Sequence, residues 1–528
     1  MKLRGFTGLL LGVVILLGLL ATGKTTRAGQ DADGYKENMR KFSKTLALIE
    51  KKYVQPQSSE VLIRSAIDEM LYRLDPYTQF MDLRSHTELI MDTRGKYGGI
   101  GLSVDIRDNV LTAISPIEGT PAFKAGIQAG DRIVAIDGEP TQDLTIDECV
   151  DRLRGDPGTI VVMTVEREGF DEPIEFRLTR AVIEIKSVPY AAMLDDRVGY
   201  IKVAQFSQST SRELETALEK LEKQGMELLL LDLRGNPGGL LDQAVRVVEK
   251  FIGAGKEVVS TRGRIPDSRR QWIAKRSATH PEFPLVILIN GGSASASEIV
   301  AGAIQDWDRG IILGTTSFGK GSVQNVIELS DGGALKITIA RYYTPSGRCI
   351  HKADNDYTRE FFPEAGEAMK THNIVDQGIG EYTTKINKRK VIGGGGIVPD
   401  ITVKPDSLSP VMREIEIKAI PFKFAVTYTA QHEISDPDFM VTDAMLKAFQ
   451  QLAQKEGVLL NEVKLNENKD DIIFSIRREI VAKLWGSDAR YREVLKHDRQ
   501  IAEALALLHD QAQYARRLTG DYTPVPSN

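Results

Sequence analysis

Cysteine is scarce in this chain, which has only Cys149 and Cys349 among its 528 residues. Two cysteines so far apart exclude a disulfide framework and a cysteine-based metal site, although a single disulfide between them stays open. The seven histidines form no HExxH or other ligand spacing, so we expect no metal ion. Nothing in the sequence predicts another cofactor.

The chain also lacks a large excess of positive or negative charge. The 68 lysines and arginines nearly balance the 73 aspartates and glutamates, which gives a formal net charge of −5. A dedicated nucleic-acid binder would present a basic face, so we expect no nucleic acid as a partner. The hydrophobic content of 42% excludes wholesale disorder. A chain of this length is expected to hold roughly three or four domains.

Long apolar runs are absent except at the N-terminus. Lys2 and Arg4 precede an apolar stretch at about residues 6–22, which is the order of a secretion signal. The length of this stretch lies between that of a cleaved signal and that of a membrane anchor, so both interpretations of residues 1–28 stay open. We therefore expect an extracytoplasmic protein in the periplasm, anchored to the inner membrane if the signal is not cleaved.

The pattern of apolar residues and glycines changes several times along the rest of the chain. Helical periodicity gives way to short strands broken by glycine, then to strand–helix alternation, and then to helical periodicity again. Strand–helix alternation predicts a parallel-rich sheet covered by helices. The predicted parts are an N-terminal helical segment at 35–93, a β-domain at 95–182, an α/β core at 183–406 and a helical C-terminal extension at 407–528 with helices at 442–455, 469–485 and 488–517.

A serine-rich turn lies between a predicted strand and a predicted helix within the α/β core. The apolar run Leu285–Ile289 is broken by two glycines, and a helical pattern begins at Glu298. A nucleophile on such a turn is held at a sheet edge beside backbone N–H groups, as acyl transfer requires. The turn carries Ser293, Ser295 and Ser297, and its position alone does not choose among them. Ser295 and Glu298 also fit a capping box, so Ser295 is equally a candidate helix cap.

Lys320 is the candidate base for this turn. A serine hydroxyl is a weak nucleophile and needs a base, and no histidine lies near the turn in the sequence. A lysine can act as a base when it is neutral, and burial among apolar groups favours the neutral form. Lys320 follows a short predicted strand and is flanked by Gly319 and Gly321. The alternative is an ordinary solvated loop lysine.

The segments GGSASASEIVAGAIQD and GTTSFGKGSVQ resemble the C-terminal processing peptidases, also called tail-specific proteases, which are PDZ-containing serine proteases with a Ser-Lys dyad. In that family the nucleophile is the middle serine of SASAS, and the lysine follows 25 positions later. The resemblance therefore implies Ser295 and Lys320 as the dyad, and Gln324 as the residue that orients the lysine amine. It covers roughly residues 35–405 and ends with GGIVPD.

The same resemblance implies the fold and the groups that bind the oxyanion. It predicts a multidomain α/β protein with a crotonase-like protease core, preceded or interrupted by a PDZ domain. The oxyanion donors would be the N–H group of Ala296 and that of Gly238 or Gly239 in the segment DLRGNPGG.

The β-domain at 95–182 resembles a PDZ domain in its landmarks. In that family a Gly-Ile-Gly-Leu loop binds the C-terminal carboxylate of a peptide, which then adds as a strand beside the one after the loop. Ile100, Gly101, Leu102 and Val104 occupy the matching positions. The alternative is a glycine-rich β-domain that binds no ligand.

The predicted function is therefore that of a serine endopeptidase that recognises protein tails and cleaves peptide bonds through an acyl-enzyme. Its expected partners are protein substrates with apolar C-terminal tails, and the terminal helical segments offer surfaces for a homodimer or an adaptor. One alternative is a catalytically silent PDZ/crotonase-fold binding or scaffold protein. Another is an acyl-CoA enzyme of the crotonase type, which the predicted signal and PDZ domain disfavour.

Overall fold

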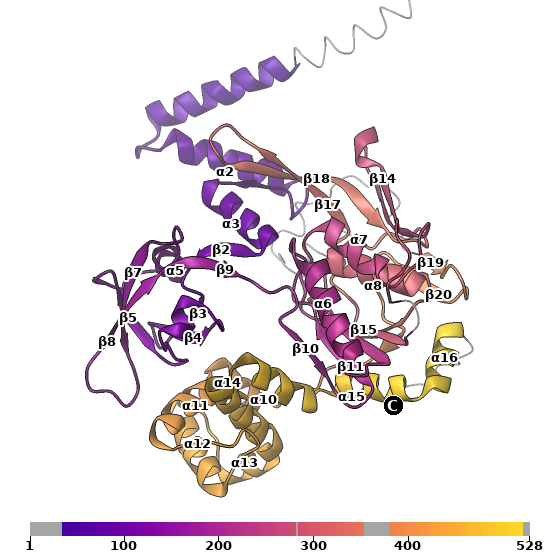
Figure 1. Ribbon diagram of the computed structural model, residues 1–528. Helices are drawn as coiled ribbons and strands as arrows, with labels where there is room; N and C mark the ends of the chain where they lie inside the picture. The colour runs from indigo at the N-terminus through magenta and orange to yellow at the C-terminus, as the bar shows by residue number, and fades with distance from the viewer. Residues whose placement is uncertain (1–33, 281–282, 353–379, 521–528) are drawn as a thin grey trace, which may run out of the picture. The chain divides into compact units, whose positions relative to one another are not determined.

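A computed structural model describes residues 34–280, 283–352 and 380–520 (Figure 1). The predicted signal or anchor at residues 1–28 lies outside these ranges. Among the residues described, no helix combines the length and the apolar character needed to cross a membrane. The chain forms two compact units, of which the first contains the N-terminal residues up to Met81 together with 326–328 and 334–337.

The first unit consists of two helices and a short antiparallel strand pair. Residues 34–52 are helical, and α2 (Ser59–Tyr72) follows. The turn after α2 is held by Asp75, whose carboxylate accepts hydrogen bonds from the N–H groups of Tyr77 and Thr78 at 2.8 Å each. Strand β1 (Gln79–Met81) then pairs antiparallel with residues 334–336.

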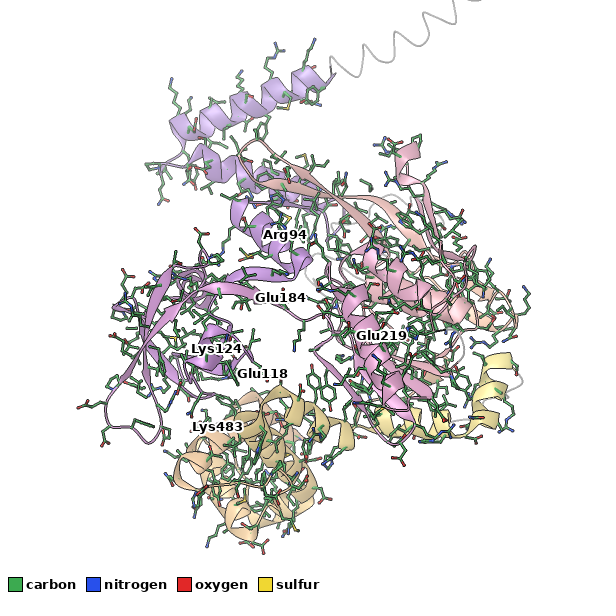
Figure 2. The ribbon with its side chains drawn as sticks, viewed as in Figure 1. Arg94, Glu118, Lys124, Glu184, Glu219 and Lys483 are labelled. Atoms are coloured by element: carbon green, nitrogen blue, oxygen red, sulfur yellow. The ribbon has the colours of Figure 1, made fainter. Side chains whose placement is uncertain are left out.

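The β-domain of the second unit has an antiparallel sheet with β3 at one edge and β8 at the other. The strand order is β3 (Leu102–Arg107), β4 (Val110–Pro116), β5 (Arg132–Ile136), β7 (Ile160–Glu166), β8 (Ile174–Thr179), with β6 (Glu139–Pro140) beside β5. Helices α4 (Pro121–Lys124) and α5 (Ile146–Leu153) pack against it, and β2 (Lys96–Gly99) pairs with β9 (Ala181–Glu184). Lys124 and Glu184 mark α4 and β9 in Figure 2. The short helix α3 (Leu83–Arg94) precedes β2.

The α/β core is built on a six-stranded sheet, and it is parallel except for its first strand. The order is β10 (Tyr190–Met193), β11 (Val198–Lys202), β12 (Leu228–Asp232), β15 (Leu285–Ile289), β16 (Ile311–Gly314), β21 (Ile401–Thr402). The fully buried runs Leu228–Asp232 and Leu285–Ile289 are typical of parallel strands covered on both faces. The predicted parallel-rich sheet is confirmed.

Alternate residues of each central strand enter two different hydrophobic clusters, because successive side chains point to opposite faces. Leu229 and Leu231 pack with helices α6 (Thr210–Lys223), α7 (Leu241–Glu249) and α8 (Ala296–Asp306). Leu228 and Leu230 pack instead with α15 (Arg499–His509) and α16 (Gln511–Thr519). The end of the C-terminal extension therefore covers the second face of the core sheet.

A smaller antiparallel sheet stands beside the core. It contains β13 (Glu257–Arg262), β14 (Arg270–Ile273), β17 (Ser322–Glu328) and β18 (Ala334–Tyr343). The hairpin β19 (Gly380–Thr383) and β20 (Lys390–Gly393) pairs separately. Cys149 and Cys349 are both buried free thiols.

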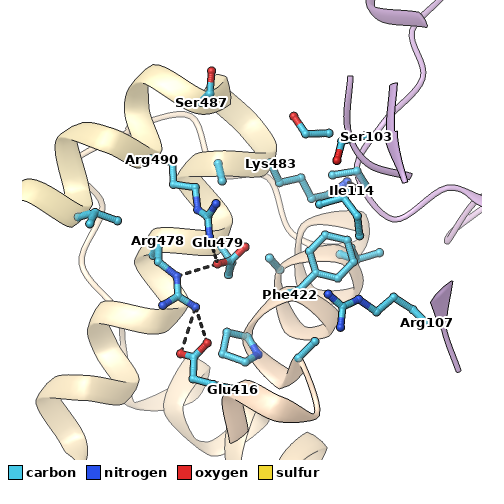
Figure 3. Close-up of a pocket in the computed structure, with 18 of the residues that line it drawn as sticks. Ser103, Arg107, Ile114, Glu416, Phe422, Arg478, Glu479, Lys483, Ser487 and Arg490 are labelled. Atoms are coloured by element: carbon cyan, nitrogen blue, oxygen red, sulfur yellow. Dashed lines mark hydrogen bonds and ion pairs between the residues drawn. The ribbon is translucent and has the colours of Figure 1, made fainter. Parts of the chain in front are cut away.

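The remaining helices of the extension have a hydrophobic core of their own. They are α10 (Pro410–Ile417), α11 (Ile420–Gln431), α12 (Asp443–Lys455), α13 (Glu462–Glu467) and α14 (Lys469–Lys496). A cavity of about 670 Å³ lies among α11, α14, β3 and β4 (Figure 3). At its wall the Arg478 side chain bridges the carboxylates of Glu416 and Glu479.

The predicted helix at 488–517 is wrong as one continuous element. The helix α14 runs past Gly486, which has a non-helical backbone, and ends at Lys496. Asp498 then caps α15, and Asp510 caps α16, each by accepting hydrogen bonds from backbone N–H groups of the following turn. These aspartates are N-caps that the apolar periodicity does not register.

Candidate active site

Three loops leave the carboxyl ends of three neighbouring parallel strands. Residues 233–240 follow β12, residues 290–295 follow β15, and residues 315–321 follow β16. Ligands of open α/β sheets bind in the crevice outside the carboxyl ends of the strands. The serine turn, the lysine loop and the segment DLRGNPGG are therefore brought to one edge of the sheet.

The backbone of Ser295 is strained. Its φ is 54° and its ψ is −111°, a conformation that non-glycine residues rarely adopt. Such strain persists only where the surrounding structure imposes it, and it concentrates at functional sites. A serine at a sharp strand-to-helix turn of this kind presents its hydroxyl at the top of the sheet. Ser295 is half-buried, whereas its neighbours on both sides are buried.

The hydroxyls of the other two serines are committed to structural hydrogen bonds. Ser293 Oγ donates to the carbonyl oxygen of Leu233 at 2.8 Å and accepts from the N–H of Asn290 at 3.0 Å. Ser297 Oγ donates to the carbonyl oxygen of Asn236 at 2.9 Å. Both serines are completely buried. They join the serine turn to the loop after β12.

The carboxylate of Glu298 joins the serine turn to the lysine loop. Its Oε2 accepts hydrogen bonds from the backbone N–H groups of Ser295 (2.8 Å) and Lys320 (2.9 Å). Its Oε1 accepts from Ser317 Oγ (2.6 Å) and from the N–H of Gly319 (2.7 Å). The hydrogen bond from the N–H of Ser295 to the Glu298 carboxylate is the one that the predicted capping box requires of Glu298. The N–H of Glu298 donates to the carbonyl oxygen of Ser295 at 2.9 Å.

Glu298 is completely buried, and burial raises the pKa of its carboxyl group to about 7. The four hydrogen bonds to its oxygens favour the charged form and limit this rise. The carboxylate form can accept all four bonds at once, whereas the protonated form has given up part of its acceptor capacity. The four hydrogen bonds that tie the serine turn to the lysine loop are therefore all formed only when Glu298 is ionised.

Lys320 lies half-buried after Gly319, and β17 follows it. Gln324, on β17, donates from its side-chain nitrogen to Ser322 Oγ (2.8 Å) and to Thr338 Oγ1 (3.2 Å). These two bonds fix the orientation of the amide. Its oxygen accepts from no donor in the part of the chain that the structure describes, so it can serve an amine.

The segment DLRGNPGG lies directly against Ser295. A Cβ placed on Gly238 would come within 2.8 Å of Ser295 Cβ and 3.0 Å of the Ala296 nitrogen. The N–H of Gly238 donates to Asn236 Oδ1 at 2.9 Å. In the described residues, no acceptor faces the N–H of Gly239 or of Ala296. Of the two glycines predicted as oxyanion donors, Gly239 is therefore the one whose N–H group stays unengaged within the described residues.

Asn236 organises this loop and was missed by sequence reasoning. Its side-chain nitrogen donates to the carbonyl of Val203 (2.9 Å), and its own carbonyl accepts from the N–H of Ala294 (3.0 Å). Glu298 was recognised only as a helix cap. The sequence shows an acidic residue three positions after Ser295. Its hydrogen bonds to the lysine loop depend on the tertiary fold.

The residues proposed for the PDZ groove lie at the free edge of the β-domain sheet. Leu102 and Val104 belong to β3, which pairs only with β4, and both pack against the domain core. Gly101 has a φ of 75°. Within the described chain, the N–H groups of Ile100 and Gly101 face no acceptor. An edge strand next to unpaired N–H groups suits the addition of a peptide strand that ends in a carboxylate.

No cluster of three or more histidine, cysteine, aspartate or glutamate side chains in the described ranges could hold a metal ion. The arrangement of the site can support acyl transfer by a hydroxyl nucleophile, because a strained serine, a lysine and unpaired N–H groups come from adjacent loops.

Three family models match parts of this chain. Residues 197–358 match peptidase family S41, residues 113–167 match a PDZ domain, and residues 20–85 match the N-terminal domain of the activating protease CtpB. A carboxy-terminal-processing protease of Bartonella bacilliformis is 41% identical over 343 residues, which are 64% of this chain and 78% of that protein.

Two further proteins are similar to parts of this chain. A carboxyl-terminal-processing protease of Synechocystis is 39% identical over 324 residues, which are 58% of this chain and 72% of that protein. Among solved structures, the photosystem II D1 C-terminal processing protease is 30% identical, with 59% of this chain and 89% of that chain covered and a TM-score of 0.35.

Proposed function

Because this chain belongs to the carboxy-terminal processing proteases of peptidase family S41, which are serine-type peptidases with a PDZ domain, we propose that Ser295 is its nucleophile and Lys320 its general base. The observation that carries the proposal is the backbone strain of Ser295 between two serines whose hydroxyls are already engaged. Of the three serines of the turn, only Ser295 combines partial exposure with the geometry of a nucleophile turn.

The proposed reaction begins with neutral Lys320, which takes the proton of Ser295 Oγ as the oxygen attacks the scissile carbonyl carbon. The N–H groups of Gly239 and Ala296 stabilise the oxyanion of the tetrahedral intermediate. Lys320 then gives its proton to the leaving amine, and water hydrolyses the ester of Ser295. Gln324 orients the amine of Lys320 through its side-chain oxygen.

We further propose that the core has the crotonase-like fold and that the PDZ domain recruits substrates. A protein tail would bind by its carboxylate to the loop at Ile100 and Gly101 and pair with the edge of β3, with Leu102 and Val104 lining the pocket for its last apolar side chain. The terminal helical segments remain our candidates for homodimer or adaptor contacts. The expected location is extracytoplasmic, with residues 1–28 as signal or anchor.

The test is cleavage of an unfolded protein with an apolar C-terminus by the purified chain. Wild type should cleave it, and Ser295→Ala and Lys320→Ala should not. If Ser295→Ala cleaved as fast as wild type, the nucleophile would be another residue. If wild type also failed to cleave, a binding or scaffold role would replace the proposal.

A further inference from the structure

The side chain of Arg234 connects the loop after β12 to the beginning of α15. Its Nη1 donates to Asp498 Oδ2 at 2.7 Å and to Gln500 Oε1 at 2.8 Å. Its Nε and Nη2 donate to the carboxylate of Asp232, at 2.6 Å in the shortest contact. One planar guanidinium thus holds a core strand and a C-terminal helix in a fixed relation.

This contact is part of a half-buried cluster in which two cations face two carboxylates. Asp232 is completely enclosed and also accepts hydrogen bonds from Tyr200 Oη (2.8 Å) and Lys202 Nζ (3.3 Å). Burial by itself raises the pKa of Asp232, but Arg234 and Lys202 outweigh it, so this pKa lies below its ordinary value. Removing Asp498 would leave one half-buried positive charge without its partner, which is unfavourable.

The backbone between Arg234 and Gly239 can transmit a displacement because most of its N–H groups are hydrogen-bonded. The N–H of Arg234 donates to Asp232 Oδ1 (2.8 Å), and its carbonyl accepts from Lys202 Nζ. The next residues are held by Asn290 and by Asn236, as the N–H of Gly235 donates to Asn290 Oδ1 at 2.9 Å. A shift of Arg234 therefore moves the glycines beside Ser295.

The start of α15 is anchored independently of Arg234. Asp498 Oδ1 caps the helix by accepting from the N–H groups of Gln500 (2.8 Å) and Ile501 (3.2 Å). The side-chain nitrogen of Gln500 donates to the carbonyl of Val403 at 2.6 Å, next to strand β21. Ile501 and Leu508 pack on the core sheet. The helix can therefore act as a fixed support for the loop.

We propose that Asp498 and Gln500 are positioning residues for the peptidase reaction, which hold the loop bearing the oxyanion donor Gly239 in place through Arg234. This inference rests on the proposed function, because it assigns a task within that site. Under this proposal, residues of the C-terminal extension contribute to catalysis by the protease core. It also predicts that a partner that shifts α15 changes the rate of cleavage.

The expected effect falls on turnover. Oxyanion donors act on the transition state and contribute little to substrate binding, so a displaced loop lowers kcat much more than it changes KM. A misplacement on the order of 1 Å can cost up to about 100-fold in rate, and we expect about tenfold for a supporting contact.

The test variant is Asp498→Ser, because serine still caps a helix but cannot reach Arg234. Asp510→Ser is its matched control, since Asp510 caps the next helix at an exposed position. The full chain is assayed with an unfolded protein substrate, with wild type and Ser295→Ala alongside, and thermal unfolding is recorded for each variant. Asp498→Asn keeps the cap and a neutral acceptor for Arg234, so it should retain more activity than Asp498→Ser.

We expect kcat of Asp498→Ser to fall about tenfold with KM changed less than about twofold, while Asp510→Ser matches wild type. Equal kcat in Asp498→Ser and wild type would overturn the positioning role and leave the proposed function intact, provided that Ser295→Ala is inactive. Activity in Ser295→Ala, or none in wild type, would overturn both. If Asp498→Ser does not fold, Gln500→Ala decides, because it removes the other acceptor of Arg234 Nη1 and unchanged kcat there would contradict the proposal.

Discussion

Ser295 and Lys320 donate their backbone N–H groups to the same oxygen atom, Oε2 of Glu298, at 2.8 and 2.9 Å. Two residues that are 25 positions apart in the chain are thereby tied through one buried side chain. The distance between the serine turn and the lysine loop depends on this carboxylate, and so does any proton transfer between their side chains.

Replacing Glu298 by glutamine should therefore lower activity although the two side chains have the same shape. An amide nitrogen would face N–H or O–H donors in place of an acceptor, and the loops would separate. We expect kcat for protein cleavage to fall about tenfold or more. Glu213→Gln, in the first turn of α6, is the control and should leave kcat unchanged. Equal activity in Glu298→Gln and wild type would contradict the role of Glu298.

The pKa of Glu298 also predicts a pH dependence of stability. The carboxyl ionises near 4.5 in the unfolded chain and near 7 in the folded one, so the folded state holds the proton more tightly. Its stabilising contribution is therefore fully present below pH 4.5 and is lost as the pH rises through 7. Urea unfolding of Ser295→Ala should show this loss between these pH values, on the order of a few kcal/mol.

The control for this measurement is the double variant Ser295→Ala with Glu298→Gln, which has no group that titrates at this place. Its free energy of unfolding should change less with pH across the same window. Identical pH profiles for the single and double variants would show that Glu298 keeps an ordinary pKa.

The rate of cleavage by wild type should fall as the pH drops below neutral, because the ionised carboxylate of Glu298 holds both loops.

Ser293 and Ser297 should matter for stability and little for chemistry. Each hydroxyl satisfies a buried carbonyl oxygen, so alanine at either position should reduce the free energy of unfolding by about 1–3 kcal/mol. The kcat of the folded fraction should stay close to that of wild type. Ser295→Ala should show the opposite pattern, with unchanged unfolding and no cleavage. Loss of cleavage in Ser293→Ala at full stability would reopen the choice of nucleophile.

A methyl group at Gly238 should disable the site. Its Cβ would lie 2.8 Å from Ser295 Cβ and 2.7 Å from the carbonyl oxygen of Ala294, so the serine turn would have to move. Gly347 has a similar φ, 92° against 101°, and no atom lies within 4 Å of its added Cβ. Gly347→Ala therefore measures the cost of positive φ alone. We expect kcat to fall about 100-fold in Gly238→Ala only.

The PDZ loop allows a similar paired test. A Cβ on Gly101 would come within 2.4 Å of the Thr120 side chain, whereas one on Gly119, with nearly the same φ, meets nothing within 4 Å. Gly101→Ala should raise KM for a substrate with a free C-terminal carboxylate, and Gly119→Ala should not. Amidating the substrate's C-terminus should remove the difference. If the amidated substrate is cleaved with the same KM as the free acid by wild type, the loop does not read the carboxylate.

Local sequence patterns predicted the elements that carry the site, because each depends on nearby residues. The buried run Leu285–Ile289 is an example, and it forms strand β15 where the sequence pattern places it. The bonds of Glu298 and Arg234 could not be predicted, because their partners are 22 and 264 positions away at Lys320 and Asp498. The break of the last helix was missed because Asp498 looks like any polar surface residue in a periodic pattern.

The position of α15 and α16 has a consequence for the order in which the enzyme is made. Strands β10 to β16 leave the ribosome before residue 315, but the helices that cover Leu228, Leu230 and Leu288 come only with residues 499–519. Until then one face of the catalytic sheet is bare and the charge of Arg234 lacks Asp498. We therefore expect this face of the core sheet to stay uncovered, and Arg234 to lack its contact with Asp498, until residues 499–519 have been synthesised.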